Sequence, residues 1–123
     1  VIIPENVLVG RVIEVFKNYS KVESIHSINT NLSVLSLENN FLALLKKDNN
    51  GSLGLKFYSD NSVFKNDDIF ITSSENKNYI AGLLVGKIKS VKNTALTNQK
   101  NVLIDLFFEP SKLRNVFVIT NYP

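Results

Sequence analysis

Short apolar runs separated by polar turn residues dominate the chain, and a helical spacing of apolar positions is nearly absent. Runs rich in Val, Ile, Leu and Phe between clusters of Asn, Ser, Asp and Gly are typical of an all-β sandwich or barrel. Within 100–108 the apolar positions alternate, with Ile104 and Leu106 on one face and Leu103 and Phe107 on the other. We predict strands over 7–16, 20–27, 31–37, 41–46, 53–58, 68–73, 83–92, 100–108 and 116–119.

One short phrase occurs twice. The segment Val9–Val15 (VGRVIEV) returns as Val85–Val91 (VGKIKSV), and both copies share the pattern Val-Gly-cation-β-branched. A glycine inside a strand pattern usually marks a bulge or a tight bend, as at a barrel corner. Two copies in a chain this short indicate two similar small β-units rather than one mixed domain.

Turn chemistry divides the predicted strands. The sequence NNGS at 49–52 is the strongest hairpin signal. The polar turn Lys65–Asp68 leads into a strand, and Pro110 ends another. We predict one helical turn at 111–114 with Ser111 as its N-cap. No Pro/Ser-rich linker separates two domains, so two units would have to abut, or one would be inserted into the other.

Four segments form an ordered set: LVGRVIEV at 8–15, KNDDIFITS at 65–73, GLLVGKI at 82–88, and FEP at 108–110 with VFV at 116–118. In this order they resemble the motifs GLVGRV-x-x-V, K-x-GD-x-V-x-TSG, G-x-P-VG-x-V and V-x-P…L-x-x-V-x-V of the rod shape-determining protein MreC family. The resemblance extends over residues 8–119.

The chain departs from the family pattern at turn and bulge positions. Asp67 and Ser74 stand where the family has glycine, and Leu84 stands where it has proline. The segment 41–47 (FLALLKK) lacks the glycines expected there. These departures concern the local geometry of turns.

The resemblance implies two small β-barrel domains, the first of them discontinuous. Residues 1–29 plus 95–123 would form the first domain, and residues 30–94 would form the second. A transmembrane helix and a coiled coil would lie upstream of Val1. The implied role is a non-catalytic scaffold on the periplasmic side of the bacterial inner membrane. It would contact the elongation-specific transpeptidase, a penicillin-binding protein, together with other rod-shape membrane proteins, and it would self-associate.

Composition narrows the chemistry. The 123 residues include no Cys, which excludes disulfides, thiolate nucleophiles and zinc-thiolate sites. They include no Met, so we expect that the chain does not start where its gene starts. No apolar run approaches the roughly 20 residues that span a bilayer. The net charge of +3 comes from cations scattered along turns, whereas nucleic-acid binders usually concentrate them on one face.

Candidate catalytic and metal-binding groups are few. The single histidine, His26, lies near Ser24 and Ser27, but no segment resembles a nucleophile elbow or an oxyanion loop. We therefore interpret His26 as a polar residue at a strand end. Asp67-Asp68 is the only adjacent acidic pair, and we interpret it as a solvated turn. We predict no catalytic residue, no metal site and no cofactor.

Binding of single-stranded nucleic acid is the alternative function. Small barrels bind single strands through stacked aromatic side chains beside cationic grooves. The segments Lys56–Tyr58 and Val63–Lys65 show some interleaving of aromatic residues with cations. Most phenylalanines, however, occupy apolar strand positions, where core packing is the usual role.

Four residues are candidates for partner binding. Tyr58 and Tyr79 are amphipathic aromatic residues near turns, and Tyr is favoured at interfaces. Leu103 and Phe107 lie opposite the Ile104 face of their strand, so they would either pack between domains or contact a partner. We interpret Arg11 and its counterpart Lys87 as flanking barrel ends.

Overall fold

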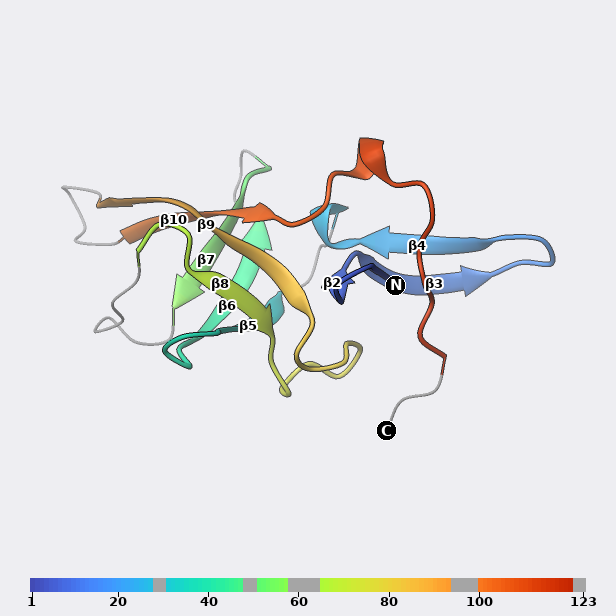
Figure 1. The fold of residues 1–123 in the computed structure, drawn as a ribbon, viewed down its shortest axis with the longest axis horizontal. Coiled ribbons are helices and arrows are strands. Elements are labelled where there is room, and N and C mark those ends of the chain that lie inside the picture. Colours follow the sequence, from blue (N-terminus) through green and yellow to red (C-terminus); the bar gives the residue numbers. More distant parts are fainter. Residues whose placement is uncertain (28–30, 48–50, 58–64, 94–99, 121–123) are drawn as a thin grey trace.

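Six strands close into an antiparallel barrel in the computed structural model, which describes residues 1–27, 31–47, 51–57, 65–93 and 100–120 (Figure 1). They pair in the order β9-β10-β7-β6-β5-β8, and β8 pairs again with β9. Closure leaves each of these strands with a neighbour on both sides. The strands are β5 (Leu32–Ser36), β6 (Leu42–Lys47), β7 (Leu53–Phe57), β8 (Ile69–Thr72), β9 (Leu84–Asn93) and β10 (Lys100–Leu106).

Alternate positions of the strands fill the barrel interior. Ala43 and Leu45 of β6 and Phe70 and Thr72 of β8 are buried, whereas the residues between them are only partly buried. Phe70 is the largest of the fully buried side chains. Successive side chains of a strand point to opposite faces, so the period of two in the sequence produces one apolar interior.

A smaller unit, which we call the hairpin unit, lies beside the barrel and comprises residues 1–27 and 108–120. It contains β1 (Ile2–Ile3), β2 (Val7–Leu8), β3 (Gly10–Val15), β4 (Ser20–Ser24) and the 3-10 turn η1 (Ile25–Ser27). Strands β3 and β4 form a separate two-stranded sheet that extends away from the barrel (Figure 1).

Two connections join the hairpin unit to the barrel, and another joins the N-terminal and C-terminal segments of the hairpin unit. Val7 of β2 pairs in parallel with Leu84 of β9. Ile2 exchanges two backbone hydrogen bonds with Phe117, of 2.9 and 2.8 Å. Val7, Leu8, Val9 and Ile25 also belong to the buried apolar cluster that includes the barrel interior. The hairpin unit is therefore packed against the barrel by a shared core.

The repeated Val-Gly-cation phrase marks two places where strands approach closely. A Cβ atom on Gly10 would collide with the backbone carbonyl of Glu23 on β4, and one on Gly86 would collide with that of Asp105 on β10. The pairing register also shifts within both strands that carry the phrase. Glycine is required at these positions because any side chain would push the partner strand away.

The fold is all-β, as predicted, with one closed six-stranded barrel. Within the described residues a second closed barrel is not seen, since β3 and β4 pair only with each other. The predicted domain boundary assigned 95–123 to the first unit, but β10 pairs with β7 and β9 inside the barrel. The structure therefore joins Lys100–Leu106 to the segment predicted as the second unit, because closing the ring requires a sixth strand.

Local predictions near the C-terminus are partly corrected. A 3-10 turn, η2, covers Pro110–Lys112, and its N-cap is Glu109 rather than Ser111. In place of the strand predicted over 116–119, Phe117 forms an isolated bridge with Ile2. In the predicted hairpin turn at 49–52, residues 49 and 50 lie outside the described residues, and Gly51 adopts φ +81°. Among the described residues, no helix has the length and apolar character needed to cross a bilayer.

Candidate functional site

A pocket of about 230 Å³ opens where the hairpin unit meets the barrel. We call it the Arg11–Tyr79 pocket. Its walls are aliphatic, and its polar side chains are the guanidinium of Arg11, the phenol of Tyr79 and the amide of Asn78. The complete lining is Val1, Leu8, Gly10, Arg11, Val12, Asn78, Tyr79, Ile80, Leu83, Val118 and Ile119.

The loop from β8 to β9 positions Tyr79 in this pocket. The Thr72 hydroxyl donates to the Ile80 carbonyl at 2.6 Å and accepts from the Leu83 amide at 2.9 Å. At the other end of the loop, the Asn76 side chain donates to the Ser33 carbonyl at 2.7 Å and accepts from the Ser33 amide at 2.9 Å. These bonds tie the loop to β5 and β8, so the barrel holds Tyr79 in place.

The Tyr79 hydroxyl is buried and has no hydrogen-bond partner among the described residues. Burial raises the pKa of the Tyr79 phenol above its ordinary value. The Arg11 guanidinium opposes this rise in pKa, and the Glu23 carboxylate adds to it. The hydroxyl is closed to solvent, and after burial the Arg11 side chain has the largest effect on its pKa.

Strand pairing positions Arg11. Arg11 of β3 lies directly opposite Glu23 of β4, and the guanidinium Nε lies 3.8 Å from a Glu23 carboxylate oxygen. This distance is near the outer limit of an ion pair, and the Arg11 side chain is 38% exposed. A single long contact to one nitrogen leaves donors of the guanidinium fork free to face the pocket.

A second candidate is the apolar surface of the β3–β4 hairpin. We call it the hairpin surface. Near its tip, Phe16 and Tyr19 stack with their ring centroids 4.6 Å apart. Val15 is 75% exposed and Tyr19 is 67% exposed. The exposed large apolar residues here are Ile13, Val15, Phe16, Tyr19 and Val22. Exposed apolar groups concentrated on one small element are typical of an interaction surface.

The four predicted partner-binding residues lie in different places. Tyr79 lines the Arg11–Tyr79 pocket. Leu103 is half-buried on β10, opposite Ser90 of β9. Phe107 is half-buried and packs against the apolar core. Tyr58 lies outside the described residues.

Sequence reasoning missed most of the surface residues. Arg11 was interpreted as flanking a barrel end, but it lies in a pocket beside Tyr79. Phe16 and Tyr19 stood out only as aromatic residues of a predicted strand and its turn. One signal was present, because Ile13, Val15, Phe16, Tyr19 and Val22 are five apolar or aromatic residues within ten positions around a polar turn.

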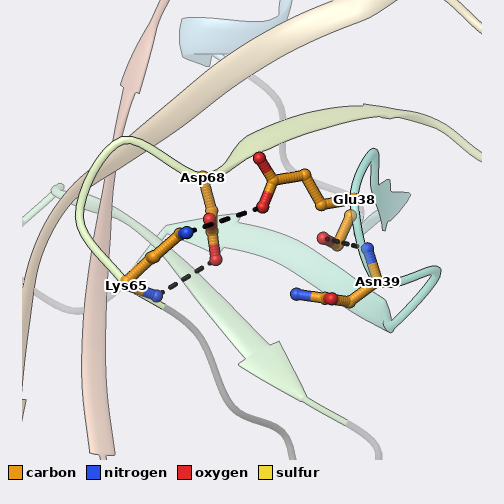
Figure 2. Close-up of polar contacts among 5 residues, drawn as sticks. Glu38, Asn39, Lys65 and Asp68 are labelled. Atoms are coloured by element: carbon orange, nitrogen blue, oxygen red, sulfur yellow. Dashed lines mark hydrogen bonds and ion pairs between the residues drawn. The ribbon is translucent and has the colours of Figure 1, made fainter.

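The turn that precedes β8 is structural (Figure 2). The Asp68 carboxylate accepts a hydrogen bond from the Lys65 amide at 3.0 Å, and Lys65 Nζ lies 3.8 Å from a Glu38 carboxylate oxygen. Asp68 is only 4% exposed, so its interpretation as half of a solvated pair was wrong. Asp67 is exposed and adopts φ +72°, the left-handed conformation for which the family motif has glycine.

His26 lies in η1, just after β4, and its ring contacts the edge of Phe108 with centroids 5.0 Å apart. Its Nε2 lies 3.4 Å from the Phe108 carbonyl oxygen, and its backbone amide donates to Ser24 Oγ at 3.1 Å. These contacts join the two segments of the hairpin unit, 1–27 and 108–120, to each other. Within the described ranges, no group of three His, Cys, Asp or Glu side chains could hold a metal ion.

Comparison with known families decides the identity of the chain. The family model described as "Rod shape-determining protein MreC, barrel core" matches residues 1–120. The chain belongs to the MreC family. A comparison with curated proteins gives no significant match.

Solved MreC structures share the fold. MreC from Pseudomonas aeruginosa is 22% identical with a TM-score of 0.70, over 81% of this chain and 65% of that one. A structure titled "MreC" is 20% identical with a TM-score of 0.77, over 89% and 62%. MreC from Helicobacter pylori, in a complex with Penicillin-Binding Protein (PBP2), is 21% identical with a TM-score of 0.63, over 85% and 66%. The chain thus spans about two thirds or less of each.

Proposed function

We propose that this chain is a non-catalytic scaffold of the cell-elongation machinery at the periplasmic face of the bacterial inner membrane. Its proposed partner is the elongation-specific penicillin-binding transpeptidase. The observation that carries the proposal is the MreC family match over residues 1–120. The complex of a solved relative with PBP2 supports a penicillin-binding protein as the partner.

The hairpin surface is the proposed main contact. Its apolar side chains are exposed, and β3 and β4 belong to a two-stranded sheet whose outer edges can accept another strand. Extended segments bind such edges through main-chain hydrogen bonds, and pockets for alternate side chains supply specificity. The barrel would serve as the rigid base that presents this hairpin.

The partner-binding residues predicted from the sequence remain part of the proposal. Tyr79 is the best placed, because it lines a pocket between the two units. Leu103 and Phe107, both half-buried on the barrel, would contribute a smaller contact on or after β10. Tyr58 is proposed from its sequence context alone.

Two further parts of the proposal concern assembly. We propose that the hairpin unit forms the first, discontinuous β-barrel domain, with its C-terminal part beginning after β10 instead of at residue 95. We also propose that the protein self-associates and contacts other rod-shape membrane proteins, because the hairpin edges and apolar side chains suit more than one partner. Binding of single-stranded nucleic acid, the alternative, gains no support from the comparisons.

Calorimetric titration of this chain with the periplasmic part of its own elongation transpeptidase tests the proposal. We expect saturable binding that changes little between low and high salt, since an apolar contact is weakly screened. Mixed-sequence single-stranded RNA is the control ligand. RNA binding that weakens steeply with salt, together with a silent transpeptidase titration, would overturn the scaffold role.

A matched pair of variants tests the hairpin surface. Val15→Asp places a charge on the hairpin, whereas Leu37→Asp places the same charge on an exposed apolar residue of the barrel. We expect Val15→Asp to weaken transpeptidase binding by about tenfold or more, and Leu37→Asp to change it by less than about twofold. Equal effects of the two variants would show that the hairpin is not the contact.

A further inference from the structure

The Arg11–Tyr79 pocket has a charge pattern that selects its occupant. Its lining includes a guanidinium, a phenol and an amide, and it includes no carboxylate. Val1 also lines the pocket, and its backbone nitrogen donates to the Gly10 carbonyl at 2.8 Å. The side-chain donors of the lining that solvent can reach belong to Arg11 and Asn78, and a ligand with acceptor oxygens fits them.

The size of the pocket limits that ligand. About 230 Å³ is below the roughly 300–1,000 Å³ of pockets that enclose cofactors and other small molecules. One or two amino-acid side chains would fill it. The aliphatic walls, which include Leu8, Ile80 and Leu83, suit the carbon stem of such a side chain.

We propose that the Arg11–Tyr79 pocket binds a carboxylate of the transpeptidase partner, presented by an Asp or Glu side chain that is flanked by apolar residues. The Arg11 fork would donate two parallel hydrogen bonds to the carboxylate, which is the favoured geometry of this pair. The ring of Tyr79, which lines the pocket, would pack against the carbon stem of that side chain. This proposal rests on the proposed function and names the chemistry of the recognised partner.

Glu23 acts as a competitor in this scheme. It contacts Arg11 at 3.8 Å when the pocket is empty, and the partner carboxylate would replace that long contact with a better one. Glu23 is absent from the pocket lining, so the exchange would move the Arg11 guanidinium away from Glu23 and toward the partner carboxylate. Glu23 would thus neutralise the charge of Arg11 until the partner carboxylate binds.

Calorimetry with the periplasmic part of the transpeptidase tests the pocket through three substitutions. Arg11→Gln should weaken binding about tenfold or more, because a hydrogen-bonded carboxylate loses its cation. Tyr79→Phe should change binding by less than about twofold, since it keeps the ring that lines the pocket and removes a hydroxyl that is closed to solvent. Glu23→Gln should strengthen binding about twofold to fivefold, since it frees Arg11 from a partly exposed ion pair.

Arg114→Gln is the matched control, because Arg114 is the other arginine of the chain and is exposed after η2. It should leave the dissociation constant within about twofold of the wild-type value. Thermal unfolding of each variant confirms that it folds. Replacing the transpeptidase's acidic residues one at a time should identify one whose loss no longer adds to Arg11→Gln in a double-mutant cycle.

The outcomes separate this proposal from the scaffold role. If the wild-type chain binds and Arg11→Gln behaves like Arg114→Gln, the pocket proposal fails and the scaffold role stands. If Glu23→Gln weakens binding as Arg11→Gln does, the ion pair only stabilises the hairpin, which also overturns the pocket proposal. A change in self-association on Arg11→Gln, with unchanged transpeptidase binding, assigns the pocket to a second copy and overturns it as well. A silent wild-type titration overturns both proposals.

Discussion

The barrel and the hairpin unit use the same apolar residue types with opposite results. In the barrel, ring closure gives each strand two neighbours, and side chains such as Phe70 and Leu45 are completely buried. In the β3–β4 hairpin each strand has one neighbour within the described residues, and Val15 and Tyr19 are mostly exposed. A two-stranded sheet has marginal stability by itself. Stability therefore resides mainly in the barrel, and surface for binding resides mainly in the hairpin.

Phenylalanine-to-alanine substitutions in the two regions should give the largest contrast. Phe70→Ala should lower the free energy of unfolding by about 3–5 kcal/mol, because it leaves a cavity at the centre of the barrel. Phe16→Ala should lower it by about 1 kcal/mol or less, since Phe16 is 39% exposed and loses mainly its stacking on Tyr19. Urea unfolding measures both values. Similar losses would show that the hairpin contributes to stability as the barrel does.

Alanine at the two repeated glycines should give a smaller contrast. Gly86→Ala should lower the free energy of unfolding by about 1–3 kcal/mol, because the new Cβ collides with the Asp105 carbonyl between two barrel strands. Gly10→Ala creates the same collision with Glu23, but the hairpin can open locally. We expect Gly10→Ala to speed amide hydrogen exchange in β3 and β4 without moving the urea midpoint of the barrel.

Gly54→Ala is the control for this pair. Its Cβ would lie 3.0 Å from the Val102 carbonyl oxygen, a tight contact that a small shift of the neighbour relieves. The expected loss of stability is below about 1 kcal/mol. A loss as large as that of Gly86→Ala would contradict the collision as the cause.

Tyr79 should give the smallest effect, confined to alkaline solution. Burial raises its pKa in the folded chain above the ordinary value of 10.0. Below pH 10 the phenol is neutral in both states, so its ionisation does not change stability. Above pH 10 the unfolded chain loses the proton first, and the free energy of unfolding falls as the pH rises. Between about pH 9 and about pH 11, the free energy of unfolding should therefore fall less for Tyr79→Phe than for the wild type. Thermal unfolding across this pH range measures both decreases. Parallel curves for the two proteins would show that the Tyr79 environment does not persist in solution.

The sequence predicted the strands better than their partners. Periodicity placed β5, β6, β8 and β9 within a few residues of their observed ends, because a period of two reports which residues face a core. Periodicity could not decide whether a strand contributes to the core of the barrel or to that of the other unit. Residues 100–108 were assigned to the first unit through the family resemblance, yet β10 completes the barrel between β9 and β7. Pairing between distant strands leaves little trace in local pattern.

The candidate site was predicted less well for a related reason. Tyr79 was identified from its amphipathic chemistry and its place near a turn, both of which are local properties. Arg11 lies 68 positions away in the chain and joins Tyr79 only because β3 folds back beside the β8–β9 loop. Asp68 shows a different error. Its place in a polar turn predicted a solvated carboxylate, but that carboxylate is buried and accepts a hydrogen bond from the Lys65 amide.

The order of apolar runs, turn residues and the repeated Val-Gly-cation phrase was sufficient to predict an all-β chain, and four ordered motifs were sufficient to show its resemblance to the MreC family. These features are local, because short-range sterics and the burial of alternate residues determine which residue types suit each position. Closure of one barrel, exposure of the β3–β4 hairpin and the meeting of Arg11 with Tyr79 emerged only in the tertiary structure. They depend on contacts between residues far apart in the chain, whose free energy is gained only when the whole sheet has assembled.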